Sequence, residues 1–503
     1  MTDYFKMRPM LLSGFICCVI CIIGYYSGIT VFILGIAAIF LFFVSAARRV
    51  KVKYLTVMFA VVLVCCSVMV TLSRINKLNM LDGCELSGSF IVTEEPKERG
   101  DYYHAVIEAN NCEGIRNGTR ISAYGNGSVP ELGDRIYASV KLKAMNDDYK
   151  LSWYSDSVYL SGSITGDISS GGNPDKVLAA VLRLRKSIRR SLFGNVGYGE
   201  ASTLIALVYG DSGYITDEFY SLIKAAGVSH IMVVSGLHLT TIVTLVTLIT
   251  NRFTRNRFVK ALVVFLTVIF MAALCGFTKS VLRAGLCYII LALSLCFKDD
   301  PTPENSLGAA VTIMLAAEPF SVFNISFQLS VLSTLGIITV AVPVSLRIKT
   351  PATPAGRFAK RIISAIAVTL SAMLFTLPVV IYIYGYISTV SVITNLLISF
   401  AATSALTLAA VALFINAFLP FAAYPFFLAA GILAKYMNSV ITFFGSMPFS
   451  TVTVGKFSFY LSIFLLCGVI ILLFACKKSK DMLRLKEMDE KIIHEGGGKL
   501  KWR

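Results

Sequence analysis

The chain contains a succession of apolar runs, each about as long as a membrane-crossing helix. A helix needs ~20 mainly apolar residues to cross the hydrocarbon layer. Of the 503 residues, 56% are hydrophobic and only 15% are charged, whereas about a quarter of the residues of a soluble protein are charged. A single soluble core does not grow to this size, so we expect an α-helical polytopic membrane protein with about 11–12 spans. The expected spans are 10–27, 29–47, 54–73, 230–250, 258–276, 281–297, 306–321, 325–343, 361–384, 390–416, 421–444 and 456–476.

A polar segment, residues 77–175, interrupts the apolar pattern after the third expected span. Three stretches in it, 89–93, 104–108 and 135–140, alternate between apolar and polar residues, as strands with one buried face do. Turns rich in Gly and Asn separate them, and 130–134 has the composition of a turn that opens a strand. About a hundred residues with five or six strands fit a small β-barrel of the OB-like type.

Charge is distributed unevenly along the chain. The formal net charge is +17, yet residues 77–175 hold 9 Lys and Arg against 15 Asp and Glu. Short cytoplasmic loops concentrate Lys and Arg. If the basic clusters at 48–53, 252–260, 347–361 and 477–480 are cytoplasmic, then the polar segment is extracytoplasmic and both termini are cytoplasmic. This rule accounts for most of the basicity, so net charge alone does not establish a nucleic-acid partner.

These patterns divide the chain into five segments. After the polar segment, Lys176–Phe193 has apolar and basic residues on opposite faces of a helix, as in helices that lie on a membrane surface. A further helical pair is expected around 199–210 and 215–227. The five segments are N-terminal membrane helices (1–76), an OB-like extracytoplasmic domain (77–175), amphipathic or interfacial helices (176–228), a transmembrane domain (229–476) and a cytoplasmic basic tail (477–503).

Two cysteines, Cys84 and Cys112, lie in the polar segment, whereas the other ten lie in or beside apolar spans. Cysteine in an apolar span packs as a small hydrophobic residue and needs no special role. In an extracytoplasmic domain, Cys84 and Cys112 are expected to form a disulfide. This bridge would close a loop of about 28 residues and contribute on the order of 3 kcal/mol.

The expected span at 230–250 begins with a polar run that includes His230, Ser235, Gly236 and His238. The two histidines are eight residues apart, so they share roughly one face of a helix. Three interpretations are open: a hydrolytic Ser–His pair, which needs a positioned acid; a metal site, which needs further ligands, with intramembrane cysteines or Glu318 as the conceivable donors; and the polar lining of an aqueous path. The third includes the simpler case of histidines whose hydrogen bonds are satisfied at a helix end. The third is favoured, because polar groups at membrane depth usually face a water-filled path or the bundle interior.

Four further polar residues interrupt apolar spans. Lys279 and Arg283 lie one turn apart at the start of a span, where they either snorkel to the interface or face inward toward a polyanion. Gln328 and Asn395 stand in apolar stretches, where they either line a path or hydrogen-bond between helices.

A series of motifs resembles, in chain order, the successive signatures of the ComEC-type competence protein family. They lie at 206–211, 229–239, 279–284, 326–330 and 377–397. The order of several motifs makes the resemblance specific, and it covers about residues 200–400. The polar segment is similar to that family's extracellular OB-like domain, in arrangement more than in residues.

The resemblance implies an inner-membrane channel, formed by residues 229–476, that takes up single-stranded DNA during natural transformation. The OB-like domain would meet DNA outside through stacking aromatic side chains, although its acidic balance argues against a broad electrostatic contact. The aromatic residues that it offers are Tyr102, Tyr103, Tyr124, Tyr137 and Trp153. The residues expected along the DNA path are Asp211, His230, Ser235, Gly236, His238, Lys279, Arg283, Gln328 and Asn395.

Many family members continue into a metallo-β-lactamase-like domain, whose metal ligands come from a His-x-His-x-Asp-His run. The four histidines of this chain, at 104, 230, 238 and 494, form no such run. We therefore expect a transporter and not an enzyme, without cofactor or metal. Its expected partners are single-stranded DNA, the lipid bilayer, a separate metallo-β-lactamase-like nuclease and other competence proteins. The alternative is a polytopic permease for a small molecule or a lipid intermediate, because fold analogy does not fix the cargo; a metalloenzyme that uses His230 and His238 is a weaker third interpretation.

Overall fold

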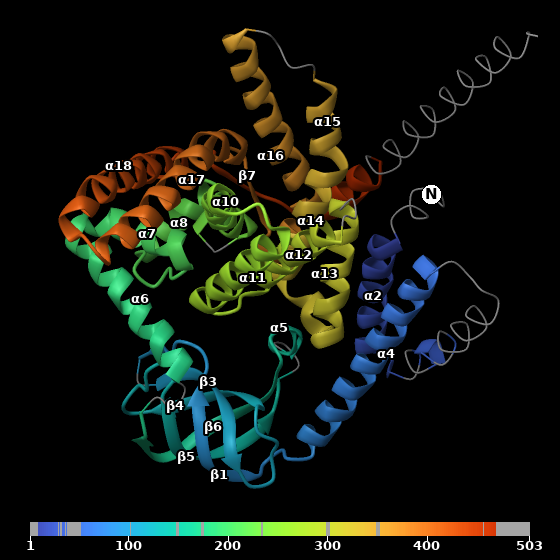
Figure 1. The fold of residues 1–503 in the computed structure, drawn as a ribbon. Coiled ribbons are helices and arrows are strands. Elements are labelled where there is room, and N and C mark those ends of the chain that lie inside the picture. The colour runs from blue at the N-terminus through green and yellow to red at the C-terminus, as the bar shows by residue number, and fades with distance from the viewer. Residues whose placement is uncertain are drawn as a thin grey trace, which may run out of the picture.

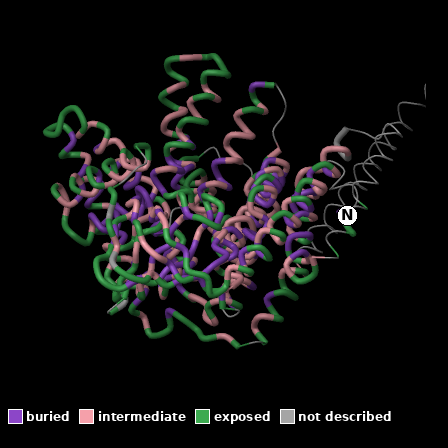
Figure 2. Tube along the Cα trace, turned by 90° about the horizontal axis from the view of Figure 1, so that it is seen from below, coloured by how far each residue is buried: buried purple, intermediate pink, exposed green. Residues whose placement is uncertain are grey.

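The structure, a computed structural model, places long helices above a small β-barrel (Figure 1). Seen from below, buried segments gather inside the molecule and exposed ones lie around its edge (Figure 2). The structure describes residues 9–28, 30, 33–35, 37, 52–100, 102–146, 150–172, 176–232, 235–297, 302–348, 353–455 and 457–468.

Eight of the described helices are long and apolar enough to cross a membrane, as expected for a polytopic membrane protein. One of the eight is the continuous helix Ile325–Arg347, in which a π-helical turn joins α14 (Ile325–Gly336) to α15 (Val342–Arg347). The expected spans at 29–47 and 456–476 lie largely or partly outside the described residues. The other seven are α2 (Pro9–Tyr26), α4 (Val52–Asn79), α11 (Arg257–Leu274), α12 (Lys279–Cys296), α16 (Pro354–Tyr384), α17 (Ser391–Asn416) and α18 (Pro420–Gly445).

Two expected spans, 230–250 and 306–321, correspond to shorter elements. Helix α13 (Pro303–Ala317) has 15 residues, about 22 Å at 1.5 Å per residue, and it stops before the 3-10 helix η1 (Pro319–Phe323). Helix α10 (Gly236–Phe253) starts later than expected, because the chain first forms the one-turn helix α9 (Ser229–Met232). Helix α10 has 18 residues, as α2 does, so its polar residues and not its length leave it outside the eight candidate spans of the described residues.

The largest hydrophobic core encloses α7 (Tyr198–Tyr209), in which every residue from Ala201 onward is buried. This helix packs against α17 and α18, whose buried faces are rich in alanine. Small residues let membrane helices approach closely. A helix that is apolar all round is buried, so α7 lies in the core rather than at an interface. Its neighbours in the chain are α6 (Lys176–Asn195) and α8 (Asp217–Ala225).

Helices α2 and α13 approach each other at two glycines, Gly14 and Gly308. A Cβ atom added to Gly308 would overlap the Met10 carbonyl group of α2. Beside this contact, the hydroxyl groups of Ser13 and Thr312 form a buried hydrogen bond of 3.0 Å. The contact fixes the N-terminal helices against the rest of the bundle.

Five strands close into the expected barrel. Their order is β1-β5-β6-β4-β3, with β3 pairing back to β1, and only the β4–β6 pair is parallel. The three stretches expected as strands coincide with parts of β1, β3 and β5, except that β1 ends at Val92, one residue before the expected end. Helix α5 (Lys150–Ser155) lies between the barrel and the helices (Figure 1). The strands are β1 (Glu85–Val92), β3 (Tyr102–Cys112), β4 (Arg120–Asn126), β5 (Arg135–Ala144) and β6 (Val158–Ser170), with the short β2 (Lys97–Arg99) beside β3; a separate pair joins β7 (Tyr386–Ser388) to β8 (Thr451–Thr453).

The expected disulfide is wrong, because Cys84 and Cys112 are both free thiols. Cys112 lies opposite Gly88 in the β1–β3 pair. Cys84 is four residues before Gly88, which in an extended strand corresponds to a distance of about 13 Å along the chain. A disulfide requires Cα atoms within about 7 Å of each other. The Cys112 thiol instead donates to the Ser89 carbonyl at 3.3 Å, and Cys84 is exposed.

Candidate functional site

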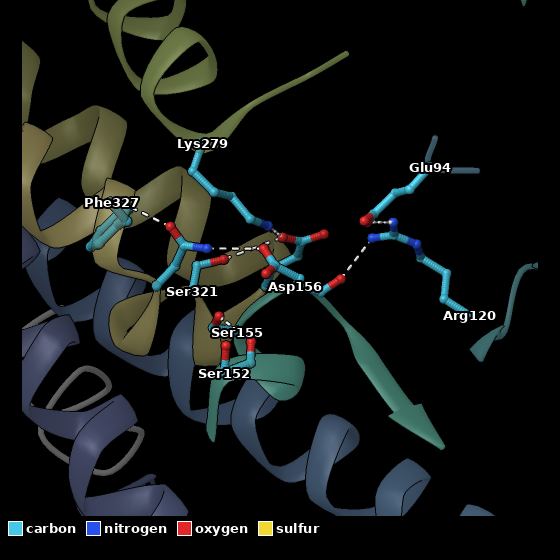
Figure 3. A network of polar contacts seen from close by, with 10 residues as sticks. Glu94, Arg120, Ser152, Ser155, Asp156, Lys279, Ser321 and Phe327 are labelled. Carbon is cyan, nitrogen blue, oxygen red and sulfur yellow. Dashed lines mark hydrogen bonds and ion pairs between the residues drawn. The ribbon is translucent and has the colours of Figure 1, made fainter. Parts of the chain in front are cut away.

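The barrel meets the helices at a junction of polar residues (Figure 3). Lys279, the first residue of α12, forms an ion pair with Glu318, which follows α13. The Ser321 hydroxyl donates to the same carboxylate at 3.2 Å. The Lys279 side chain is only 13% exposed, so its charge is largely removed from water and depends on the carboxylate.

Asp156 connects the barrel side of this junction to α14. It follows α5, and its carboxylate accepts a hydrogen bond of 2.9 Å from Asn324, the residue that caps α14. Arg120 of the barrel donates to the Asp156 carbonyl at 2.7 Å and pairs with Glu94. Burial raises the pKa of the Asp156 carboxyl, and the charge of Lys279 partly opposes this shift. The barrel is therefore tied to the helices by partly desolvated charges.

Arg283 lies one helical turn along α12 from Lys279 and contacts two further helices. Its Nε donates to the Ser330 hydroxyl of α14 at 2.8 Å, and Ser330 also hydrogen-bonds Ser280 at 3.1 Å. Its Nη2 would lie 3.0 Å from a Cβ atom placed on Gly236, at the start of α10. Arg283 is 6% exposed, so a buried guanidinium occupies the point where α10, α12 and α14 meet.

Ser235 and His238 cap the N-terminus of α10. The His238 Nδ1 accepts from the Ser235 backbone N–H at 3.0 Å, and the Ser235 hydroxyl accepts from the Leu237 N–H at 3.3 Å. The other ring nitrogen, Nε2, is buried and has no hydrogen-bond partner among the described residues. A hydrolytic Ser–His pair would need an acid at this nitrogen to orient the ring. The Ser235 hydroxyl also lies 3.1 Å from the His238 Nδ1, and together these contacts form the capping box of α10.

His230 lies beside His238 and near Asn395. Asn395, on α17, donates to the Thr369 hydroxyl of α16 at 3.2 Å, and Ser399 donates to its side-chain oxygen. Asn395 thus links two helices by hydrogen bonds. We call the connected group the polar cluster; its members are His230, Ser235, Gly236, His238, Arg283, Ser330 and Asn395.

Gln328 and Asp211 lie apart from the polar cluster. The Gln328 amide donates to the Val322 carbonyl at 2.9 Å, beside η1. Asp211 lies in the loop between α7 and α8, where its carboxylate accepts from the Gly213 N–H at 2.9 Å. Burial raises the pKa of Glu95, on the barrel, and the charge of Asp211 raises it further. The charges of Arg185 and Arg189, on α6, oppose this shift, so Glu95 lies within electrostatic reach of Asp211 and of the basic face of α6.

The barrel carries an aromatic group made of Tyr102, His104, Tyr124 and Trp153. Ring centroids are 6.2 Å apart for Tyr102 and Tyr124, 4.9 Å for His104 and Tyr124, and 5.3 Å for His104 and Trp153. Tyr102 and Tyr124 are both about two-fifths exposed, so a planar ligand can reach their rings. Trp153 belongs to α5, which packs against η1 at the junction.

The structure also separates residues that sequence reasoning grouped and adds some that it missed. Tyr103 is buried inside the barrel and Tyr137 lies on β5, so neither joins the aromatic group. Asp156 was not predicted, because an isolated acidic residue carries no sequence signal until its partner is known, and Glu318 was predicted only as a conceivable metal ligand. His104 was predicted within the strand 104–108 but not as a stacking residue, although alternation along that strand puts it on the same face as Tyr102.

Along α12, the junction and the polar cluster present cations and hydrogen-bond donors. Lys279 and Arg283 are spaced by one turn, and the start of α10 adds the Gly236 N–H, because the cap already engages the Ser235, Leu237 and His238 N–H groups. Such groups bind oxyanions. In the part of the chain that the structure describes, no three His, Cys, Asp or Glu side chains are placed to hold a metal ion. The arrangement is suited to bind and orient an anionic ligand.

Residues 207–479 match the sequence profile of the family described as competence protein. A similar protein is ComE operon protein 3 of Bacillus subtilis (strain 168), which is 27% identical over 252 residues. The alignment covers 50% of this chain and 31% of that protein, so the chain matches about a third of the relative's length. No solved structure matches the chain.

Proposed function

Because this chain belongs to the competence protein family, we propose that it is a cytoplasmic-membrane channel that takes up single-stranded DNA during natural transformation. One observation carries the proposal: aromatic, cationic and polar groups follow one another from the barrel into the helices. The aromatic group reaches the junction through Trp153, and Lys279 and Arg283 follow along α12. Proteins hold single-stranded DNA by stacking bases on aromatic rings and by cationic contacts to the backbone.

In this proposal the barrel is an OB-like domain that meets DNA outside the membrane. Counted in chain order, the five barrel strands contribute Tyr102 and His104 from the second, and Tyr124 from the third. Trp153 comes from the connection between the fourth and fifth strands. OB-folds bind oligonucleotides with the face of strands two and three and with this connection. The position of the aromatic group supports a DNA contact.

Charge supports the proposed orientation. The adjoining ends of α15 and α16, which carry Arg347, Arg357 and Lys360, lie at the end of the helices farthest from the barrel (Figure 1). Basic residues concentrate on the cytoplasmic side of membrane proteins. The barrel would then be extracytoplasmic, with both termini in the cytoplasm.

Conduction requires a change of conformation, because the polar cluster is packed shut. His238 is 1% exposed and Arg283 is 6% exposed. A strand can pass only if α10, α12 and α14 separate. Helix α14 leads into a π-helical turn at Ile337–Ala341, an irregularity that frequently marks functional sites and gives this helix a place to bend.

The channel would act with other components. A separate metallo-β-lactamase-like nuclease would supply the single strand, and other competence proteins would deliver DNA to the barrel. The residues of this chain would bind and guide the strand within the lipid bilayer, and no bond-breaking step is assigned to them.

Deletion of the gene tests the proposal. Two quantities are measured with labelled duplex DNA: the label bound at the cell surface, and the label protected from external nuclease. We expect surface binding to remain and protected DNA to disappear, and the wild-type gene to restore it. Unchanged uptake with unchanged surface binding would refute the channel and favour a permease for another cargo.

The DNA contact of the barrel has its own test on the purified full chain. Stacking is worth about 1–3 kcal/mol per base, so Tyr124→Ala and Trp153→Ala should each weaken binding of a labelled single-stranded oligonucleotide roughly tenfold. Tyr137→Ala is the matched control, because Tyr137 is exposed on β5 outside the aromatic group. Equal affinities for all three variants would refute the stacking surface.

A further inference from the structure

Arg283 is a buried cation without an anionic partner. Its Nε bonds the neutral Ser330 hydroxyl at 2.8 Å, and the titratable groups beside it are the Cys287 thiol and the Tyr288 hydroxyl. None of the carboxylates that the structure describes forms an ion pair with it. Burying a charge is costly unless an opposite charge compensates it. The guanidinium therefore lacks a compensating anion.

The surroundings of this guanidinium add positive potential instead of cancelling it. Its Nη2 would lie 3.0 Å from a Cβ atom on Gly236, so it faces the N-terminus of α10. A helix N-terminus carries a partial charge of about +0.5, and the cap of α10 consists of Ser235 and His238, neither of which is an anion. A cation and a helix N-terminus repel each other, but both attract the same negative group.

We infer that this place is a binding site for one phosphodiester group, held by the Arg283 guanidinium and the Gly236 N–H at the start of α10, the one N–H there that the cap leaves free. A guanidinium binds two phosphate oxygens through parallel hydrogen bonds. Ser330 positions it by accepting from Nε, and the Cys287 thiol is a further neutral partner, so no described anion occupies the terminal nitrogens. The bound phosphate would turn the repulsion between α10 and α12 into attraction.

The position of the site favours a DNA strand over a lipid headgroup as the source of the phosphodiester. Lys279, one turn away on α12, is paired at the barrel junction, and its side chain is 13% exposed. A strand leaving the barrel meets this junction first and Arg283 next. This assignment to DNA rests on the proposed function, whereas the anion site itself follows from the buried charge.

The test uses the purified full chain in a sugar detergent, with inorganic phosphate as the first probe and chloride at equal ionic strength as the reference. A ligand that binds only the folded state raises the unfolding temperature. We expect a saturable rise for the wild type and, for Arg283→Gln, an apparent affinity at least about tenfold weaker. Arg252→Gln, at the exposed opposite end of α10, is the matched control and should respond as the wild type does.

Two measurements separate a binding role of Arg283 from a structural one. Without phosphate, Arg283→Gln should unfold at or above the wild-type temperature, because a charge without a partner has been removed; a lower temperature would indicate a structural arginine and overturn the site. Gly236→Ala keeps the charge but places a methyl group against Nη2. It should also weaken the phosphate response, and an unchanged response would contradict the position of the site.

Two further probes distinguish the sources of phosphate: a single-stranded thymidine oligonucleotide, and phosphatidylglycerol in mixed micelles. A response to the oligonucleotide that depends on Arg283 supports the DNA assignment, and an Arg283-dependent response to phosphatidylglycerol alone overturns it. The site is overturned if phosphate does not raise the unfolding temperature of the wild type, or if it raises that of Arg283→Gln as much as that of the wild type. Failure of the proposed function would give a different result from failure of the anion site. In that case cells without the gene would still take up DNA, while the purified protein would still bind phosphate in a manner that depends on Arg283.

Discussion

The ion pair between Lys279 and Glu318 should be energetically asymmetric. The Lys279 side chain is 13% exposed and that of Glu318 is 41% exposed. Glu318→Gln therefore leaves a largely buried ammonium without its carboxylate, whereas Lys279→Met leaves a carboxylate that water still reaches. The first substitution should be the more harmful.

The exposures set the size of the effect. Removing one partner of a fully buried pair costs about 3–5 kcal/mol, and an exposed pair is worth about 0–1 kcal/mol. Glu318 lies between these limits, and the nearby Asp156 compensates part of the Lys279 charge. We expect Glu318→Gln to lower the free energy of unfolding by about 1–2 kcal/mol, and Lys279→Met to lower it by less than about 1 kcal/mol.

Unfolding of the purified full chain, monitored for both single variants and the double variant, measures this asymmetry. The double variant should lose less stability than Glu318→Gln alone, because it contains no unpaired ammonium. Glu131→Gln, at an exposed carboxylate of the barrel, is the control and should stay within about 0.5 kcal/mol of the wild type. A larger loss for Lys279→Met than for Glu318→Gln would refute the burial of Lys279 at the junction.

Three further predictions concern the barrel, the N-terminal helices and the junction. Cys84 should react with a thiol reagent in the native, unreduced protein and Cys112 only after unfolding; protection of both until reduction would re-establish the disulfide. Gly308→Ala should lower the free energy of unfolding by about 1–3 kcal/mol, because the added methyl group overlaps the backbone of α2. The control Gly194→Ala, with no atom within 4 Å of its Cβ position, should leave stability unchanged or raise it. Similar unfolding temperatures for the two variants would contradict the close contact. Burial raises the pKa of Asp156 in the folded state, so the folded chain keeps the carboxyl proton up to a higher pH than the unfolded chain does. The contribution of Asp156 to stability therefore rises as the pH falls from the raised pKa of the folded state to the unfolded-state pKa of about 3.9. Asp156→Asn should remove this part of the pH dependence, and identical stability profiles between about pH 4 and 7 would contradict it.

Sequence patterns predicted the fold where a pattern has a local physical cause. Apolar runs predicted the long helices, and alternation predicted strands β1, β3 and β5, because both depend only on which side of an element is buried. Register has no such local signal, since alternation stays the same when a strand shifts by two residues. The expected disulfide failed for this reason: the spacing of Cys84 and Cys112 does not show which residues lie opposite each other.

The candidate site was predicted in part. The motifs named Gly236 and Arg283, which the structure brings together although α11 separates them in the chain. The partners Ser330, Glu318 and Asp156 come from α14, from the end of α13 and from the barrel. Their contacts depend on how these elements dock, which no local pattern encodes. Gln328 and Asp211 instead make local contacts, beside η1 and within a loop, away from the polar cluster.

Site-specific photocrosslinking during DNA uptake tests most directly the claim that a DNA strand passes between α10, α12 and α14. A photoreactive amino acid is placed either at residue 330 of α14, within the polar cluster, or at residue 270 of α11, where Phe270 is 52% exposed on the outer surface. In cells that take up labelled DNA, we expect crosslinks from position 330 and none from position 270. Labelled DNA that enters the cell without crosslinking at position 330, or that crosslinks equally at both positions, would contradict the account.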